Sequence, residues 1–469
     1  MNANANRKQY TANAYGARLD GVTLSTAAIQ QAIDEAAAAG GGRVGFEPGA
    51  YLTGAIFLKS HVELHLSEGV ELRAAVDETA YPEIWPRVAG IEMLWHSAVI
   101  NICGQHHASI TEPGLIDGQG EYWWHKYWGE DRLGGMRKDY TAQGLRWAVD
   151  YDCKRPRNVL VMNASHVELE QFTLIRSPFW NVHICYSDRV RVSGLQIRQN
   201  YGPSSDGIDI DSSSNVLVEH CYIDCNDDNL CIKSGRDADG LRVNRPSEHI
   251  VIRDCETGRG GGITLGSETS GGIRDVEIYN IKAVGTGNGL RLKSARTRGG
   301  LIEDIRVHDI EMIDVPNPFS FQLNWNPSYS YASVPEDYKG EIPDHWKVMA
   351  EQVQPPERGI PEFRNIDISN IVVKSFSRTD EDHSDSEDQA SSAQLHPKQS
   401  FSRAFDVEAY PEKPIRDIRW RNITIETDTA GAIAHAADWT MDNVVLRTRD
   451  GELPKIEHCS NVELPKLES

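Results

Sequence analysis

Apolar residues recur along the chain in short runs that alternate with polar residues. One series of runs follows a small or polar residue each time: NVHI (181–184), GIDI (207–210), NLCI (229–232), GITL (262–265) and GLRL (289–292). A second series is interleaved with the first: VELE (167–170), VRVS (190–193), VLVE (216–219), IVIR (250–253), VEIY (276–279) and IRVH (305–308). Such alternation predicts short strands with one buried face. Within each series, successive runs start 22 to 34 residues apart.

This spacing indicates that one supersecondary unit repeats, and that stacked copies bury a common core. Helical patterns hardly recur between the runs, which excludes βαβ and leucine-rich-type repeats. A propeller would need four-strand blocks of about 40–45 residues with their own signature. We therefore predict an all-β fold, a single-stranded right-handed parallel β-helix.

One segment, TAAIQQAIDEAAAAGGG (26–42), has a helical pattern instead. Its apolar residues follow i, i+3, i+4 spacing: Ile29, Ala32 and Ile33. Ser25 and Thr26 are candidate N-caps, and Gly40 ends the pattern. We expect this helix to cap the N-terminal end of the β-helix, where an open sheet edge would invite aggregation.

We predict a single β-helix domain over residues 1–469. Its parts are the N-terminal cap and first coils (14–75), the catalytic coils (158–320) and the C-terminal coils (363–460). Two segments rich in Trp and Tyr, 119–157 and 316–360, interrupt the repeat. Long ordered loops often carry function, although these could simply cover the side of the coils. A third interruption, 378–400, is acidic at its start and is expected to be a solvated, mobile loop.

The overall charge restricts the partners. The chain has 48 Lys and Arg against 69 Asp and Glu, a net charge of −21. This argues against nucleic acid or an anionic membrane as a partner. An anionic substrate must then be met by a local cluster of cations.

The N-terminus has no apolar leader core, and no run of about 18 apolar residues occurs. We therefore expect a cytoplasmic protein, although a secreted chain trimmed of its leader would look the same. The eight cysteines are scattered, so we expect reduced thiols rather than disulfides. Association into an oligomer is compatible with this sequence.

Charged residues gather in three places on successive coils: Asp206 in YGPSSDGIDIDS, Asp227 and Asp228 in CNDDNLCIKSG, and Arg291 and Lys293 in GLRLKSARTRGG. Asp206 and Asp227 each precede a strand of the first series. Stacking those strands would bring the carboxylates within one coil spacing, about 5 Å. Close-packed acids cannot all stay ionised, so that one becomes a proton donor at neutral pH.

Glycoside hydrolysis needs this division of labour between two carboxyl groups. Arg291 and Lys293 would bind an anionic sugar, and a uronate carboxylate is the expected ligand. Each residue also has a plainer interpretation as a turn aspartate or an exposed ladder of cations. Two other functions stay open: a Ca²⁺-dependent uronate lyase with Arg or Lys as base, and a non-catalytic sugar-binding β-helix.

These motifs resemble glycoside hydrolase family 28, the polygalacturonases and their relatives. The resemblance runs over residues 14–320, through these segments in the family's order: the cap region, RSPFWNVHI, SSDGIDIDSSSNVLVEHCYIDCNDDNLCIKSG, GGITLGSETSGGIRDV and GLRLKSARTRGG. The family's Asn-Thr-Asp, Asp-Asp and Arg-x-Lys motifs fall on Ser204–Ser205–Asp206, Asp227–Asp228 and Arg291–Leu292–Lys293. The resemblance implies an inverting hydrolase with Asp227 as general acid and Asp206 with Asp228 as bases. No metal or other cofactor is then needed.

The sequence departs from the family at two places. The family's Gly-His-Gly motif falls on GRGGGITLGSE (258–268), and counting back from its GSE puts Gly260 in the place of the histidine. Arg259 is a candidate to substitute for it, and Ser204 replaces an asparagine that would contact substrate. Lys233, behind the Asp pair, is a further candidate for substrate binding.

From these features we expect a hydrolase that releases galacturonic acid from the ends of pectic oligosaccharides, either oligogalacturonides or rhamnogalacturonan fragments. Action at chain ends is expected because the two aromatic segments could wall off one end of the groove, and because a cytoplasmic enzyme would meet imported oligomers. Four tryptophans are candidates to stack on sugar faces: Trp123, Trp124, Trp128 and Trp147.

Overall fold

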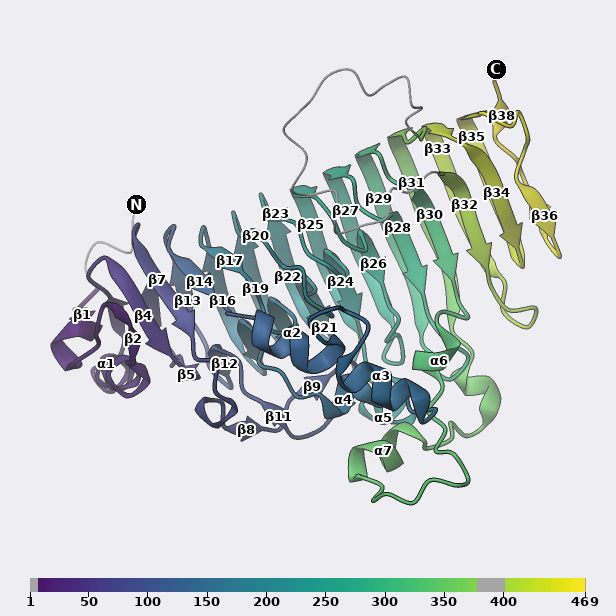
Figure 1. Ribbon diagram of the computed structural model, residues 1–469. Coiled ribbons are helices and arrows are strands. Elements are labelled where there is room, and N and C mark those ends of the chain that lie inside the picture. The colour runs from purple at the N-terminus through teal and green to yellow at the C-terminus, as the bar shows by residue number, and fades with distance from the viewer. Residues whose placement is uncertain (1–6, 378–400, 469) are drawn as a thin grey trace.

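The computed structural model describes residues 7–377 and 401–468, and its strands lie in two long parallel sheets that run the length of the molecule (Figure 1). The predicted acidic loop at 378–400 lies outside the described residues. One sheet has 12 strands: β5 (Ile56–Phe57), β12 (Ile100–Cys103), β15 (Val159–Met162), β18 (Val182–Cys185), β21 (Ile208–Asp211), β24 (Leu230–Lys233), β26 (Ile263–Leu265), β28 (Asn288–Lys293), β30 (Asn317–Gln322), β32 (Arg403–Glu408), β34 (Thr429–Ala434) and β36 (Lys455–Glu457).

The other sheet has 22 strands, which form the remaining walls of the coils. They are β1 (Gln9–Thr11), β2 (Asp20–Leu24), β3 (Gly42–Gly45), β4 (Gly49–Thr53), β6 (Val62–His65), β7 (Val70–Ala74), β13 (Ser109–Thr111), β14 (Leu115–Asp117), β16 (Ser165–Glu170), β17 (Thr173–Ile175), β19 (Asp188–Ser193), β20 (Gln196–Arg198), β22 (Ser214–Glu219), β23 (Tyr222–Ile223), β25 (Ser247–Thr257), β27 (Ile273–Val284), β29 (Leu301–Ile313), β31 (Glu362–Lys374), β33 (Ile415–Thr427), β35 (Ala436–Thr448), β37 (Ser460–Val462) and β38 (Lys466–Leu467).

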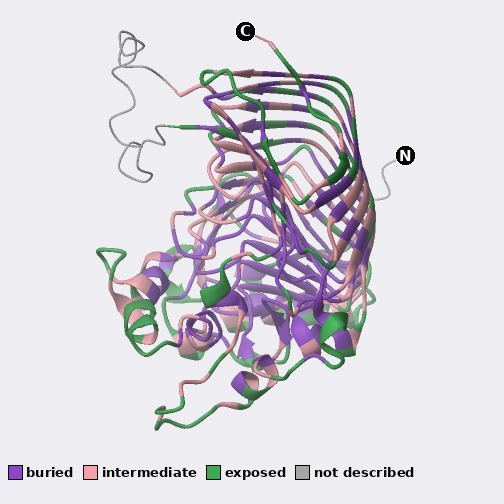
Figure 2. Ribbon diagram, turned by 90° about the vertical axis from the view of Figure 1, so that its right-hand side faces the viewer, coloured by how far each residue is buried: buried purple, intermediate pink, exposed green. Residues whose placement is uncertain are grey.

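The right-handed parallel β-helix predicted from the spacing is confirmed. The five runs of the first series all lie in the 12-stranded sheet, and the six runs of the second series all lie in the 22-stranded sheet. Each strand pairs in register with the strand one coil away, which stacks apolar side chains in inward columns. One such column is fully buried: Ile184, Ile210, Ile232, Leu265, Leu292 and Phe321. Figure 2 shows the buried residues along the inside of the coils.

Helix α1 (Thr26–Ala38) covers the N-terminal end of the stack, as predicted (Figure 1). It buries Ile29, Ala32, Ile33 and Ala36 against the first coils. The chain leaves the helix through Gly40 and Gly41, which both have positive φ. Ser25 stands at the N-cap position, as expected, but its hydroxyl makes no capping hydrogen bond and instead hydrogen-bonds the backbone of Arg18 and Thr23.

The other helices gather along one side of the coils (Figure 1). They are α2 (Glu121–Trp128), α3 (Gly135–Ala142), α4 (Val149–Asp152), α5 (Asp237–Val243), α6 (Pro327–Ser330) and α7 (Asp344–Met349). The short pairs β8 (Glu83–Ile84) with β11 (Trp95–His96) and β9 (Arg87–Val88) with β10 (Ile91–Glu92) belong to the same layer. This layer has a hydrophobic cluster of its own, which joins residues from four segments: Trp95, Trp147, Tyr151, Trp180, Tyr329 and Trp346 among others.

All eight cysteines lie in the described part of the chain and are free, in agreement with the expectation of thiols. Among the described helices, none has the length and apolar character that a membrane crossing requires.

Candidate active site

The charged residues lie on the outer face of the 12-stranded sheet, over β21, β24, β26 and β28. Side chains alternate between the two faces of a strand, so that Ile210 points into the core while Asp209 points outward. In register with Asp209 stand Cys231, Thr264 and Arg291 on the next three strands. The helical layer covers this face, which is why its polar side chains are buried although they point away from the core.

The three predicted acids converge. One carboxylate oxygen from each of Asp206, Asp227 and Asp228 lies within 4.8 Å of the others. Register explains the approach, because Ile208 pairs with Leu230 and each is preceded two residues earlier by an acid, Asp206 and Asp228. A backbone hydrogen bond joins the two coils beside these acids: the Gly207 amide donates to the Asp228 carbonyl at 2.9 Å.

Asp228 is held as a carboxylate by three donors. Lys293 Nζ lies 2.6 Å from Oδ2, and Arg291 and Thr264 donate to Oδ1 at 3.4 and 2.9 Å. Burial alone would raise the pKa of Asp228, but Lys293, Arg291 and Lys233 outweigh it and hold that pKa well below its ordinary value. Asp228 is therefore ionised at neutral pH.

Asp227 has the opposite electrostatic environment. Burial and the neighbouring charge of Asp228 raise its pKa, against the opposing effect of Lys293, Lys233 and Arg291. Its side chain is only partly buried and lines the cavity described below. A carboxyl group that has a raised pKa and faces a cavity has the properties of a general acid.

Lys233, which lines the cavity, lies among three carboxylates. Its Nζ is 3.5 Å from Asp206, 3.3 Å from Asp209 and 3.6 Å from Glu268. Burial raises the pKa of Asp206 well above its ordinary value and that of Asp209 to about 7, although Lys233 opposes both shifts.

A count of the charged groups agrees with the raised pKa values of three of the aspartates. Four aspartates (206, 209, 227 and 228) share three cations, Lys233, Arg291 and Lys293, and Lys233 is shared with Glu268 as well. The carboxyl groups of the cluster thus outnumber these cations, in keeping with the raised pKa values of Asp206, Asp209 and Asp227. Asp209 and Glu268 were not predicted as site residues. The alternation in GIDI puts Asp209 on the outer face, so its position could have been inferred from the pattern.

A cavity of about 190 Å³ opens over the acids. It is lined by the acids themselves with Lys233, Lys293 and Glu268, by Tyr127, Trp128, Arg137, Arg146 and Asp150 from the first aromatic segment, and by Trp325, Asn326 and Tyr329 from the second. Both segments therefore contribute to the site instead of merely covering the coils.

The four candidate tryptophans lie in different environments. Only Trp128 lines the cavity. Trp123 is packed in the core, whereas Trp124 and Trp147 are buried with their indole N–H groups donating to Ser177 O and Ser333 O. Two rings that were not predicted do line the cavity, Trp180 beneath Lys233 Nζ at 4.7 Å and Trp325 beneath Lys293 Nζ at 4.4 Å.

A family model described as "Glycosyl hydrolases family 28" matches residues 91–334, which include every one of these acids and cations. The chain belongs to glycosyl hydrolases family 28. A "Probable polygalacturonase" of Vitis vinifera is 32% identical over 379 residues, 76% of this chain and 73% of that protein. An "Exo-poly-alpha-D-galacturonosidase" of Dickeya chrysanthemi is 26% identical over 61% of this chain and 52% of its own length.

Solved structures of family 28 enzymes match nearly the whole chain. The exopolygalacturonase from Thermotoga maritima superposes with a TM-score of 0.72 at 26% identity, covering 94% of this chain and 91% of that one. The Yersinia enterocolitica family 28 exopolygalacturonase gives a TM-score of 0.74 at 20% identity, which bears on the fold alone. Membership in this family identifies the chain as a glycoside hydrolase and decides against the lyase and the non-catalytic module.

The position expected for the family's histidine needs a correction by one residue. Ile263 pairs with Leu230, so Gly261 stands level with Asp228, and a Cβ at Gly261 would meet Asp228 Oδ1 at 2.4 Å. A Cβ at Gly260 would instead meet Asn229 Oδ1 at 2.4 Å. Among the described residues no histidine lines the cavity.

Arg259 does not replace that histidine. Its guanidinium donates to both oxygens of Asp224, at 3.0 and 3.2 Å, and lies over the ring of Tyr201. It is not among the residues that line the cavity, so that its predicted role in substrate binding stays a prediction. Ser204 does line the cavity, next to Asp206, where its hydroxyl accepts a 3.5 Å hydrogen bond from Arg155.

Proposed function

We propose that this enzyme releases galacturonic acid from the ends of short pectic oligosaccharides by inverting hydrolysis. The observation that carries the proposal is the small cavity over the acids, walled on two sides by segments 119–157 and 316–360. A cavity of this size suits one terminal sugar better than the middle of a polymer. The names of the Dickeya and Thermotoga relatives, both exo-acting, support the same specificity.

In the proposed reaction Asp227 gives its proton to the glycosidic oxygen as the bond from that oxygen to C1 breaks. Asp228, ionised and held in place by Lys293 and Thr264, takes a proton from the water that bonds to C1, assisted by Asp206. The products are a free uronic acid and a shortened oligosaccharide. Lys293, Arg291 and Lys233 offset part of the acid charge. The proposed reaction uses no metal ion, and a chelator should leave turnover unchanged.

The cations of the cavity support an anionic sugar as substrate. Lys293, Arg137 and Arg146 line the cavity, and Arg291, which does not line it, lies 3.4 Å from Asp228. A net charge of −21 makes such a local cluster necessary. Rhamnogalacturonan fragments stay a second substrate class, because Ser204 stands where the family motif has asparagine. A cytoplasmic location, part of this proposal, would supply imported oligomers.

The decisive test is product analysis with oligogalacturonides and rhamnogalacturonan oligomers, beside viscometry on polygalacturonate. We expect monomeric galacturonic acid from the first minutes and little loss of viscosity. Rapid loss of viscosity with a ladder of oligomers would contradict exo action.

The stereochemistry needs a separate measurement. The acid oxygens lie within 4.8 Å, whereas inverting pairs are usually about 6.5–9.5 Å apart and retaining pairs about 5–5.5 Å. We still favour inversion, because Asp228 is bound by three donors and is poorly placed to act as a nucleophile. Proton NMR of the first-formed anomer decides: retention of configuration would contradict the proposal.

A further inference from the structure

Three histidines that the hydrolysis does not use lie together at a corner of the N-terminal coils. His61 stands just before β6, while His106 and His107 stand between β12 and β13 in the next coil. All three are exposed, and one ring nitrogen from each lies within 4.8 Å of the others.

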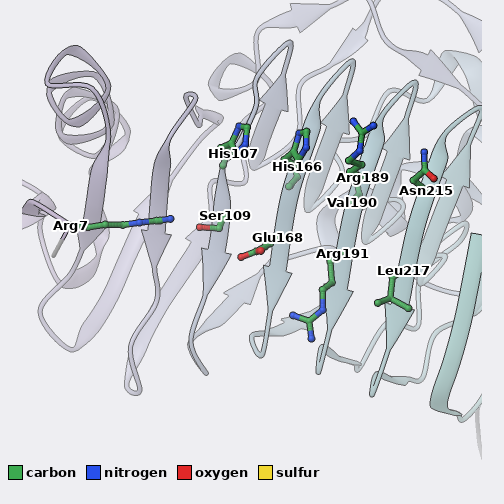
Figure 3. Close-up of a pocket in the computed structure, with 12 residues that line it drawn as sticks. Arg7, His107, Ser109, His166, Glu168, Arg189, Val190, Arg191, Asn215 and Leu217 are labelled. Atoms are coloured by element: carbon green, nitrogen blue, oxygen red, sulfur yellow. The ribbon is translucent and has the colours of Figure 1, made fainter. Parts of the chain in front are cut away.

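Part of this arrangement follows from the coil geometry. Each coil turns this corner with one residue at positive φ, and these residues stack in a row: His61, His107, His166, Arg189 and Asn215. The rings of His107 and His166 stack with centroids 4.5 Å apart and planes 5° apart, and those of His61 and His107 lie 5.2 Å apart. Figure 3 shows His107, His166, Arg189 and Asn215 following one another along this row.

Stacking does not account for His106. It precedes the row and has no positive φ, yet its ring stands edge-on to that of His61, with centroids 4.8 Å apart. Its Nδ1 lies 3.1 Å from Nδ1 of His107. Only one proton fits between two nitrogens at this distance, so at least one of them presents a lone pair to the other.

The same separation suits two ligands of one cation. With a cation about 2.1 Å from each nitrogen, the angle between the two nitrogens at the cation would be roughly 95°, which copper, nickel and zinc accept. Imidazole is a favoured ligand of these ions.

Hydrogen bonds between the two coils hold the segments that carry the histidines in place without any ion. The Ser60 amide and hydroxyl both donate to Gln105 Oε1 at 2.8 Å, and the His106 amide donates to Ser60 Oγ at 3.1 Å. The His61 amide donates to the His106 carbonyl at 3.1 Å. The two coils are thus tied together at the level of the three rings, which reduces the ordering cost of binding.

We propose that His61, His106 and His107 form a surface site for one divalent transition-metal ion, with water completing the coordination. The ion would cross-link two successive coils next to the cap helix. Because it binds the folded chain and bridges segments 45 residues apart, it would stabilise the N-terminal coils.

The test uses the full chain without added histidines, titrated calorimetrically with Ni²⁺ and Zn²⁺, and unfolded thermally with metal or with chelator. We expect one ion per chain and a metal-dependent rise in Tm. His107→Ala and His61→Ala should each weaken binding at least about tenfold and abolish the rise in Tm.

His249→Ala is the matched control, since His249 is exposed at the same kind of corner, with positive φ, but its Nδ1 pairs with Asp275 at 2.6 Å. This variant should bind as the wild type does, and turnover should be unchanged in all three variants. No metal-dependent change in Tm for the wild type, or equal binding by His107→Ala, would overturn the proposal.

Discussion

Lys293 Nζ lies 2.6 Å from Oδ2 of Asp228, and both side chains are almost completely buried. Strand β28 supplies the lysine and the turn before β24 supplies the acid, 65 positions apart in the sequence. This ion pair holds Asp228 ionised, whereas the pKa values of Asp206, Asp209 and Asp227 are raised.

Replacing Lys293 by Met should therefore damage both stability and activity. Breaking a buried pair leaves an uncompensated charge and costs about 3–5 kcal/mol, measured by urea unfolding, while kcat/KM should fall at least about a hundredfold. Lys347→Met is the control, since Lys347 forms an exposed pair with Asp344 at 2.8 Å, and exposed pairs contribute at most about 1 kcal/mol. Equal effects of the two substitutions would contradict the assignment.

The same pair predicts how stability depends on pH. The pKa of Asp228 in the folded protein lies below its ordinary value, so its stabilising contribution is present above the unfolded pKa, near 3.9, and is lost as pH falls through the folded pKa. The difference in unfolding free energy between wild type and Lys293→Met should be largest above about pH 5 and shrink under more acidic conditions. A difference that grows on acidification would be inconsistent with this.

Asp227→Asn should remove the proton donor. We expect kcat to fall about 10²–10⁴-fold on oligogalacturonides with the fold unchanged. On an aryl galacturonide, whose leaving group needs no proton, the kcat of the variant should fall much less. Asp224→Asn, which alters the carboxylate bound by Arg259 outside the cavity, serves as the control and should stay within a few fold of wild type. Full activity of Asp227→Asn would mean that another residue is the acid.

Asp209→Asn should stabilise the protein at alkaline pH. The pKa of Asp209 is raised to about 7, so folding disfavours its ionised form, and this penalty grows as pH rises from the unfolded pKa to the folded one. The asparagine variant should gain roughly 1–4 kcal/mol relative to wild type at pH 8 and nothing near pH 4. Urea unfolding at the two pH values checks this, and equal gains at both would be evidence against a buried proton at Asp209.

Arg137→Ala should raise KM for oligogalacturonides about tenfold with little change in kcat, because a charge-assisted bond to a substrate carboxylate contributes about 1.5–3 kcal/mol. Arg137 lies on α3 and lines the cavity. Lys138→Ala is the control, since Lys138 is the next residue and does not line it. An unchanged KM for Arg137→Ala would place the substrate carboxylate elsewhere, at Arg291 or Arg146.

Sequence reasoning predicted positions correctly wherever the reason was periodic. GIDI and NLCI fall in paired strands, so the acids before them meet one coil apart, although Asp228 and not the expected Asp227 stands level with Asp206. Arg291 and Lys293 follow on one face of β28. It failed where residues had to be counted across a run of glycines: the register of β26, and not the distance to GSE, decides that Gly261 faces Asp228.

The sequence by itself determined the β-helix, its capping helix and the convergence of three acids with two cations. Those features follow from local alternation and from a repeat that stacks equal phases. The tertiary structure alone decided what covers the acids. Trp325 and Trp128 line the cavity. Arg259 is paired with Asp224. Lys233 lies within 3.6 Å of Asp206, Asp209 and Glu268. These contacts join segments that are up to 200 residues apart, and no local pattern encodes how such segments pack against one another.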